Sequence, residues 1–416
     1  MFDSTVILNA RLPQRSGLYQ IAIQAGEVTK IEPADQLLNQ SLSQPLTQPL
    51  SQSLSTPPRT AIDVEGDWIT LGAIDLQING ALGLAFPDLR PDSLGKLQSI
   101  CELLWQQGVS GFCPTLVTTS LENFHGSLAA IRLFQQQQAY VDKADSARVL
   151  GAHLEGPFLN RAKRGAHPAE FLQPLTRSAV ETVVGKFADA ISIVTLAPEE
   201  AVEGVGEEGV EDGTVIPWLS AQGITVSLGH SLATAQQAKQ AFDQGATMVT
   251  HAFNAMPGLH HREPGLLGAA LSDLRVFCGF IADGQHICPT MLDLLLRVGR
   301  GSRDAQMGGL FLVSDALSPL GLPDGVYPWD SRQIEVTKGT ARLADGTLSG
   351  TTLPLIEGAA NLVRWGLCDA EEAIALVTAA PRRAIGLPAL SVGSPAQLIR
   401  WSQDAQNQLV WQWLSL

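Results

Sequence analysis

Ionisable side chains end several strongly apolar runs of this sequence, and their types suggest hydrolytic chemistry. Glu155 ends one run, His230 and His251 end two others, and Asp315 ends a fourth. One carboxylate and two imidazoles form the ligand set of a catalytic divalent metal ion that keeps one coordination position open. Such an ion lowers the pKa of bound water towards about 7 and can polarise a carbonyl. The pattern therefore predicts metal-assisted hydrolysis.

Each of these residues also has an ordinary structural explanation. A lone histidine at a strand end is more often a core or capping residue than a ligand, and Glu155 could be an ion-paired carboxylate. The joint occurrence of the three favours the metal site. Asp315 follows a run too apolar to solvate it and could serve as the general base, although SDALSP also fits a helix start capped by Asp315. His153 shares a strand face with Glu155 and could support the site from behind.

Eight apolar runs of strand length, with helix-length segments between them, would position these residues. Near-continuous apolar strands alternating with helices are typical of a parallel sheet buried on both faces. Eight of them predict an α/β fold, a closed TIM-like (β/α)8 barrel whose active site lies at the carboxyl ends of its strands. The expected strands span Ile69–Asn79, Gly108–Thr118, Val149–Phe158, Ile191–Pro198, Gly223–His230, Ala246–Asn254, Val276–Asp283 and Gly309–Ala316.

The two ends of the chain and two internal stretches differ from this central pattern. Short alternating runs near both termini predict β-strands. Residues 38–60 are biased to Ser, Gln, Leu and Pro, which predicts a surface loop. The acidic stretch 199–213 interrupts the fourth helical region and is expected to be a solvated insertion without chemistry, as charge runs usually are.

Composition narrows the class of protein. The 416 residues are 45% hydrophobic and 16% charged, which suits a globular chain with one or two cores. Its net charge of −14 argues against a nucleic-acid or anionic-membrane partner. The sequence has no run typical of an export signal or a membrane span, so we expect a cytoplasmic protein. The scattered cysteines fit reduced thiols and are expected to be buried; they are Cys101, Cys113, Cys278, Cys288 and Cys368.

Seven segments, in order and spacing, resemble those of the N-acetylglucosamine-6-phosphate deacetylase family within the amidohydrolase superfamily. They are GAIDLQINGALGLAF, GAHLEGPFLNRAKRGAHP, VSLGHS, THAFNAMPGLHHREPGLLGAAL, FIADGQHICP, LVSDA and GTLSGTTL, and the resemblance runs from about Asp63 to Gly386. It implies an amidohydrolase barrel over residues 69–386. It also implies a small β-sandwich made from residues 1–68, including the loop 38–60, and residues 387–416.

The resemblance also assigns roles to individual residues. It implies that Glu155, His230 and His251 bind the metal and that Asp315 is the acid and base. It gives His167 a contact to the substrate carbonyl and Ala166 a backbone contact. The implied contacts to the sugar phosphate are Asn254, Ala255, Arg262, the loop Asp283, Gly284, Gln285 and His286, and the segment Leu348, Ser349 and Gly350.

The chain departs from the wider superfamily at the first strand. Many amidohydrolases hold a second metal there with His-x-His, whereas this chain has Gln77 and Asn79. Amides are poor ligands for zinc-like ions, so we expect one divalent ion per subunit, most readily zinc, with iron, cobalt or manganese as alternatives. Two further departures, at Cys288 and Gln397, do not touch the inferred chemistry.

The resemblance implies hydrolysis of N-acetyl-D-glucosamine 6-phosphate to D-glucosamine 6-phosphate and acetate, in amino-sugar salvage. Arg262 suits a phosphate dianion, although it could instead be a surface residue paired with Glu263. Two alternatives stay open: a deacetylase for another N-acetylhexosamine phosphate, such as the galactosamine epimer, or a non-catalytic binding protein. A phosphosugar substrate and a homo-oligomer, dimer or tetramer, are the expected partners.

Overall fold

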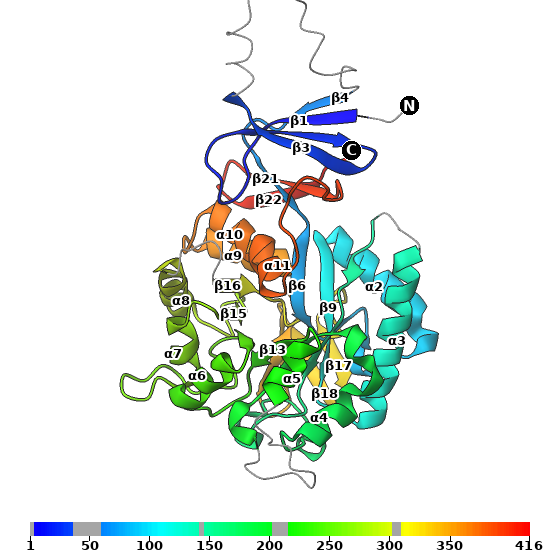
Figure 1. Ribbon diagram of the computed structural model, residues 1–416, viewed down its shortest axis with the longest axis vertical. Helices are drawn as coiled ribbons and strands as arrows, with labels where there is room; N and C mark the ends of the chain where they lie inside the picture. The colour runs from blue at the N-terminus through cyan, green and yellow to red at the C-terminus, as the bar shows by residue number, and fades with distance from the viewer. Residues whose placement is uncertain (1–3, 36–59, 141–144, 202–214, 302–308) are drawn as a thin grey trace, which may run out of the picture.

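The computed structural model describes residues 4–35, 60–140, 145–201, 215–301 and 309–416 (Figure 1). A large barrel-shaped body carries a smaller β-structure at one end, and the first and last described segments of the chain lie in that smaller part. The predicted loop 38–60 and acidic stretch 199–213 lie outside the described residues, except for Thr60 and residues 199–201. Among the described residues, no helix is both long and apolar enough to cross a membrane.

Eight parallel strands form the barrel wall, and each lies within one of the eight predicted runs. Neighbours in the sheet follow the chain order, and the first strand pairs with the second. The strands are β6 (Ala73–Ile78), β9 (Val109–Val117), β11 (Ala152–Glu155), β12 (Ile191–Leu196), β13 (Thr225–Leu228), β14 (Ala246–Val249), β15 (Phe277–Phe280) and β16 (Gly309–Leu312). The sequence-based prediction of a TIM-like barrel is confirmed.

The barrel closes between its first and last strands just beyond the end of β16. The Asp315 amide donates to the Gln77 carbonyl at 2.9 Å, and the Asn79 amide donates to the Ala316 carbonyl at 2.7 Å. The buried Asp75 carboxylate also accepts the Ser314 amide at 3.2 Å across this seam. The closure therefore joins the segment that carries Asp315 directly to the segment that carries Gln77 and Asn79.

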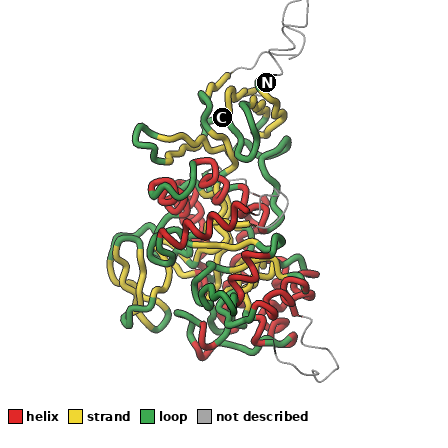
Figure 2. Tube along the Cα trace, turned by 90° about the vertical axis from the view of Figure 1, so that its left-hand side faces the viewer, coloured by secondary structure: helices red, strands yellow, loops and turns green. Residues whose placement is uncertain are grey.

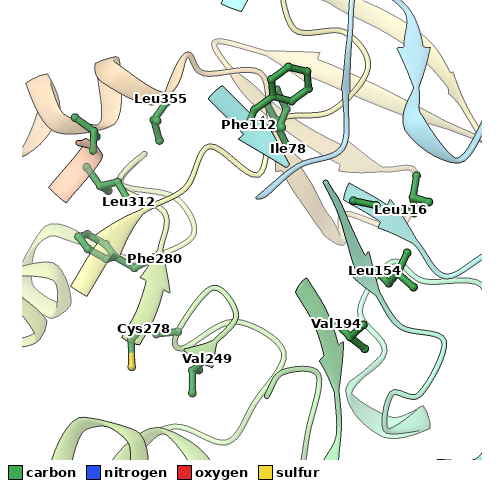
Figure 3. Packing of buried hydrophobic residues seen from close by; sticks show 14 of the residues in the cluster. Ile78, Phe112, Leu116, Leu154, Val194, Val249, Cys278, Phe280, Leu312 and Leu355 are labelled. Carbon is green, nitrogen blue, oxygen red and sulfur yellow. The ribbon is translucent and has the colours of Figure 1, made fainter. Parts of the chain in front are cut away.

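Helices lie around the strands of the barrel (Figure 2). Apolar side chains of the strands and helices form one buried cluster. Figure 3 shows part of this core, in which Phe280 and Leu312 of the strands lie near Leu355 of α9. Burial of a side chain of this size stabilises the fold by roughly 1.5–3 kcal/mol. The helices are α2 (Leu94–Gln106), α3 (Leu121–Tyr140), α4 (Arg177–Val184), α5 (Val215–Ala221), α6 (Ala235–Asp243), α7 (Gly265–Ser272), α8 (Pro289–Gly301), α9 (Leu355–Arg364), α10 (Ala370–Val377) and α11 (Ala379–Ala384).

Local sequence signals explain where several of these helices begin. In front of α6, the Thr234 side chain accepts the Gln237 amide, and the Gln237 side chain accepts the Thr234 amide. This reciprocal arrangement satisfies amide groups that have no partner within the helix. Asp369 caps α10 in a similar way by accepting the Glu372 amide at 2.8 Å. Such caps fix where each helix starts and therefore the length of the loop that precedes it.

The predicted β-strands at the two chain ends pack together into one small unit. One sheet has the order β3-β2-β1-β4, and the other has the order β22-β21-β5. Ile7, Ile21, Ile69 and Leu398 lie in their shared core. The strands are β1 (Ser4–Ala10), β2 (Tyr19–Gln24), β3 (Glu27–Pro33), β4 (Thr60–Asp63), β5 (Trp68–Leu71), β21 (Leu398–Gln403) and β22 (Leu409–Trp413).

The predicted first strand, 69–79, is in fact two strands that belong to different parts of the molecule. β5 joins the terminal sheets, β6 begins the barrel, and Gly72 stands between them. A Cβ atom at Gly72 would lie 2.5 Å from side-chain atoms of Ser110 and Trp413, so the chain passes at a point where only glycine fits.

A four-stranded antiparallel sheet follows the last barrel strand and was not predicted. Its core contains Leu317, Trp329 and Ile334, with Ala166 packed against it. Its strands are β17 (Gly325–Trp329), β18 (Arg332–Thr337), β19 (Thr340–Leu343) and β20 (Leu348–Thr351). Three short strands complete the described set: β7 (Gly80–Ala81), β8 (Leu84–Ala85) and β10 (Arg148–Val149).

No disulfide joins the five cysteines, as expected, but they are not all buried. Cys101, Cys113 and Cys278 are buried and Cys368 is half-buried, whereas Cys288 is exposed at the start of α8. The expectation of burial is wrong for Cys288 because it precedes the first turn of a surface helix.

Candidate active site

Three ligand-type atoms converge at the carboxyl ends of the barrel strands. Glu155 Oε1 lies 3.1 Å from His230 Nε2 and 3.0 Å from His251 Nε2, and the two imidazole nitrogens are 3.0 Å apart. All three side chains are buried. A tetrahedral ion with bonds of about 2.0–2.1 Å holds its ligand atoms only slightly farther apart, at roughly 3.3 Å. The spacing therefore fits a single small cation.

Hydrogen bonds identify which nitrogen of His230 faces this cluster with a lone pair. The Nδ1 atom of His230 lies 2.9 Å from the Lys163 carbonyl oxygen, which can only accept, so Nδ1 carries the proton. In the neutral ring Nε2 then points a lone pair at the Glu155 carboxylate. A cation between the Nε2 lone pair and the carboxylate would remove the repulsion between them. A metal-binding histidine usually donates its other ring N–H to a group such as a backbone carbonyl, as His230 does here. The donor set thus fits a metal ion.

Several residues of this cluster adopt the left-handed backbone region that non-glycine residues rarely occupy. The φ angles are 49° at His230, 26° at His251 and 48° at Asp315. Each such conformation costs on the order of 1–3 kcal/mol and persists only where the surroundings enforce it. These three residues directly follow barrel strands or their short extensions. The backbone therefore turns sharply to point the side chains into the site.

Asp315 lies beside the cluster and is held by the two amide side chains of the first strand. Asn79 donates to Asp315 Oδ1 at 2.7 Å, and Gln77 donates to the same oxygen at 3.2 Å. Gln77 also donates to Glu155 Oε1 at 3.0 Å and so connects the two carboxylates. Burial raises the pKa of the Asp315 carboxyl, and the nearby Glu155 charge raises it further. Both effects favour proton uptake.

The alternative explanation of Asp315 as a helix cap is wrong, because turns follow it and the next helix, α9, begins only at Leu355. Its backbone is instead held against β20. The Thr351 amide donates to the Asp315 carbonyl at 3.0 Å, and a Cβ atom at Gly350 would lie 2.7 Å from that same oxygen. Glycine at this position thus permits the close approach that fixes Asp315.

His167 faces the same cluster from the loop after β11. Its Nδ1 accepts the Thr118 amide at 3.3 Å, which leaves the proton of the neutral ring on Nε2. That Nε2 lies 3.9 Å from Glu155 Oε2. Burial, and after it the neighbouring His230, lower the pKa of His167 to about 3. His167 is therefore a neutral hydrogen-bond donor directed into the site.

His153 lies in the barrel interior, with both of its ring nitrogens already engaged. Nδ1 is 3.0 Å from the Leu76 carbonyl, and Nε2 is 2.7 Å from Thr195 Oγ1. Burial lowers the pKa of His153 to about 4. This arrangement leaves His153 no nitrogen for a metal, and its contacts support strands rather than ligands.

A cavity of about 510 Å³ opens over the cluster and collects most of the predicted site residues. Those lining it are Asn79, Glu155, Ala166, His167, His230, His251, Asn254, Ala255, His286, Asp315, Leu348 and Ser349. The loop from Asp283 is folded on itself, since the Asp283 carboxylate accepts the Gln285 and His286 amides at 2.8 Å and contacts His286 Nδ1 at 2.7 Å. This carboxylate therefore presents His286 to the cavity.

Arg262 does not line this cavity. It is exposed on a surface loop, where its guanidinium lies 2.8 Å from His261 Nε2. The alternative ion pair with Glu263 is also not found among the described residues. Within one chain, Arg262 therefore stands apart from the other predicted substrate contacts.

Comparison with known proteins agrees with this arrangement. The sequence model that defines the amidohydrolase family matches residues 68–412 of this chain. The chain belongs to the amidohydrolase family. It is 36% identical over 369 residues to N-acetylglucosamine-6-phosphate deacetylase from Bos taurus, covering 84% of this chain and 85% of that one. It is 32% identical over 358 residues to N-acetylgalactosamine-6-phosphate deacetylase from Escherichia coli O157:H7, with coverages of 85% and 89%.

Solved structures of deacetylases resemble this amidohydrolase over nearly its whole length. The crystal structure of N-acetylglucosamine-6-phosphate deacetylase from Pasteurella multocida is 26% identical with a TM-score of 0.76, covering 99% of this chain and 100% of that one. The corresponding enzyme from Thermotoga maritima is 25% identical with a TM-score of 0.74, at 97% and 96% coverage. The similarity thus includes the terminal sheets as well as the barrel.

The β17–β18 hairpin forms part of the cavity wall in this amidohydrolase. This part of the wall was not predicted from the sequence. Trp329 at the end of β17 and Asp330 in the turn before β18 line the cavity. Next to them, Arg332 donates to the Ala166 carbonyl at 2.6 Å and so ties the sheet to the loop that carries His167. The alternation in RQIEVT, followed by the turn residues Lys338 and Gly339, was the available signal for this hairpin. Phe171, Thr119 and Asn123 are further lining residues that were not predicted.

Amidohydrolases are metal-dependent, and the described residues contain one group that could hold an ion. Gln77 and Asn79 donate through their amide nitrogens to the Glu155 and Asp315 carboxylates. Amides are poor ligands for zinc-like ions, so these two side chains do not favour a second metal site. We expect about one tightly bound divalent ion per chain, measured by elemental analysis of the purified protein. Two ions per chain, each surviving dialysis, would contradict this prediction.

Proposed function

We propose that this amidohydrolase removes the acetyl group of N-acetyl-D-glucosamine 6-phosphate, giving D-glucosamine 6-phosphate and acetate. The observation that carries the proposal is the convergence of Glu155, His230 and His251 beside Asp315, in a cavity that also contains His167. The relatives named as deacetylases of this substrate support the choice of sugar. Amino-sugar salvage is the pathway in which such a reaction serves.

Glu155, His230 and His251 would hold the divalent ion, and their one-oxygen, two-nitrogen set suits zinc, with iron, cobalt or manganese as alternatives. A bound ion of this kind lowers the pKa of water and polarises a carbonyl. Asp315 takes the proton of the attacking water and later gives it to the leaving amine. Through their hydrogen bonds to Oδ1, Gln77 and Asn79 keep the Asp315 carboxylate directed at the attacking water and the leaving amine.

His167 donates its Nε2 proton to the acetyl carbonyl oxygen, where negative charge develops during attack. Its neutral state and fixed orientation, held by Thr118, suit this role because the donor needs no rearrangement at the moment of reaction. Asn254, Ala255 and His286 line the same cavity and bind the sugar phosphate. The Ala166 backbone, Leu348 and Ser349 complete the contacts, with Gly284 and Gln285 in the loop that leads to His286 and Gly350 in β20.

A second candidate substrate is the galactosamine epimer, because one relative of similar identity is named as an N-acetylgalactosamine-6-phosphate deacetylase. Acetate release from both epimers, with and without a chelator, tests the proposal. We expect chelator-sensitive release with a higher kcat/KM for the glucosamine form. A reversed preference would assign the galactosamine substrate, and no release from either would make the chain a binding protein.

Arg262 carries a separate prediction about phosphate. If it forms charge-assisted bonds to the phosphate dianion, Arg262→Ala should lose roughly 1.5–3 kcal/mol of substrate binding. The unphosphorylated sugar should be almost indifferent to the same change. KM for both sugars is the measurement, with Arg297→Ala on the outer face of α8 as a matched control. Equal losses for both sugars would make Arg262 structural.

We also propose that the protein is cytoplasmic and forms a homo-oligomer, a dimer or tetramer. Five cysteines without a disulfide among them fit a reducing compartment. An oligomer would offer the exposed Arg262 a cavity other than its own. Sedimentation analysis of the purified protein tests the second point, and a monomer at working concentrations would oppose it.

A further inference from the structure

Two acidic residues at the start of the stretch expected to lack chemistry contact the segments that flank His230. Glu199 and Glu200 end the short helical turn Pro198–Glu200 that follows β12, and both are half-buried. Each carboxylate bonds to a loop that carries or supports His230. They are therefore not part of a solvated surface insertion, and the expectation is corrected for these two residues.

Glu199 holds the backbone that directly follows His230. Its Oε2 accepts the Ser231 hydroxyl at 2.7 Å, and its Oε1 accepts the Leu232 amide. The Ser231 hydroxyl oxygen in turn accepts the Ala233 amide at 2.9 Å. Bonds to an ionised carboxylate are among the stronger hydrogen bonds in proteins. One side chain thus fixes the three residues after His230.

Glu200 supports His230 from the other side through Asn160. Glu200 Oε1 accepts the Asn160 side-chain amide at 2.7 Å, and the Asn160 backbone amide donates to the His230 carbonyl at 2.9 Å. Asn160 also caps the turn that ends at Lys163 by accepting the Ala162 amide. The Lys163 carbonyl is the group that receives the His230 ring proton. The second carboxylate therefore fixes the acceptor that orients the ring.

His230 needs such support because its backbone conformation is unfavourable. A φ of 49° at a non-glycine residue relaxes unless neighbouring bonds oppose the relaxation. Rotation of the backbone at His230 would swing Nε2 away from Glu155 and His251, since the ring follows its Cα. We propose that Glu199 is a positioning residue that keeps His230 in metal-binding geometry through Ser231 and Leu232. This inference rests on the assignment of His230 as a metal ligand.

The test is zinc affinity, measured on full-length protein stripped by a chelator and titrated with Zn²⁺ against a chromogenic competitor. Loss of a residue that orients a metal ligand typically weakens metal binding about 10–100-fold, and we expect that loss in Glu199→Ala. Glu199→Gln keeps an acceptor for Leu232 and should stay within a few-fold of the parent. Added zinc should restore activity to Glu199→Ala.

Controls separate this inference from general destabilisation and from the metal site itself. Glu335→Ala, at an exposed position of β18, should bind zinc like the parent. Parent-like zinc affinity in Glu199→Ala, or an equal loss in Glu335→Ala, overturns the inference while leaving the metal site intact. If Glu199→Ala does not fold, Ser231→Ala replaces it. Parent-like zinc affinity in Ser231→Ala would then overturn the inference. Undiminished zinc binding in His230→Ala would instead overturn the ligand assignment.

Discussion

Replacing His230 or His251 with alanine should remove both the bound metal and most of the activity, while the barrel stays folded. Each imidazole supplies one of only three ligand atoms, so its loss should exceed the roughly 10–100-fold cost of removing a residue that merely orients a ligand. The measurements are metal content by elemental analysis and acetate release at saturating substrate. Circular dichroism checks the fold.

The fold should survive because both rings lie at the strand ends and not within the apolar core between strands and helices. His125→Ala serves as a matched control, since this histidine lies on the outer helix α3 and contacts the Thr182 carbonyl. It should retain metal and activity. Full metal occupancy in either cluster variant would show that the ligand assignment is wrong.

The barrel was predictable because its strands carry a strong signal. Strands covered on both faces must be apolar throughout, so runs such as the one that contains β12 stand out from the helices between them. The convergence of Glu155, His230 and His251 followed from the same topology, since parallel strands end on one face of the barrel. Which nitrogen of His230 is protonated depends on the Lys163 carbonyl, 67 positions away, and no local pattern reveals it.

Other features depended on contacts that a single sequence does not specify. The sheet β17–β20 is short-stranded and partly exposed, so its strands lack the continuous apolar run that marks the buried barrel strands. Glu199 belongs to a run of acidic residues, and only its contacts with Ser231 and Leu232 in the folded chain reveal its position beside His230. Arg262 matched a sequence pattern, yet the folded chain keeps it out of the cavity because its loop points to solvent.

Asp315→Asn should lower kcat by a factor on the order of 10²–10⁴, the usual contribution of general acid–base catalysis, with KM and metal content close to those of the parent. Asparagine keeps the size of the side chain and an oxygen that can accept from Asn79 and Gln77, so the geometry of the site should persist. It cannot take up a proton, however. Both proton transfers of the proposed reaction therefore fail together.

The pattern of the loss decides the role of Asp315. A residue that only holds β20 through its backbone carbonyl would tolerate the change, because the Thr351 amide bonds to the main chain and not to the carboxylate. Asp404→Asn, in the turn between β21 and β22, is the matched control and should turn over like the parent, since its carboxylate accepts only local amides. Steady-state kinetics on both variants, with metal content measured in parallel, gives the comparison. Near-parental turnover in Asp315→Asn would remove this residue from the reaction and require another proton carrier within the cavity, whose lining also contains Asp88, His286 and Asp330.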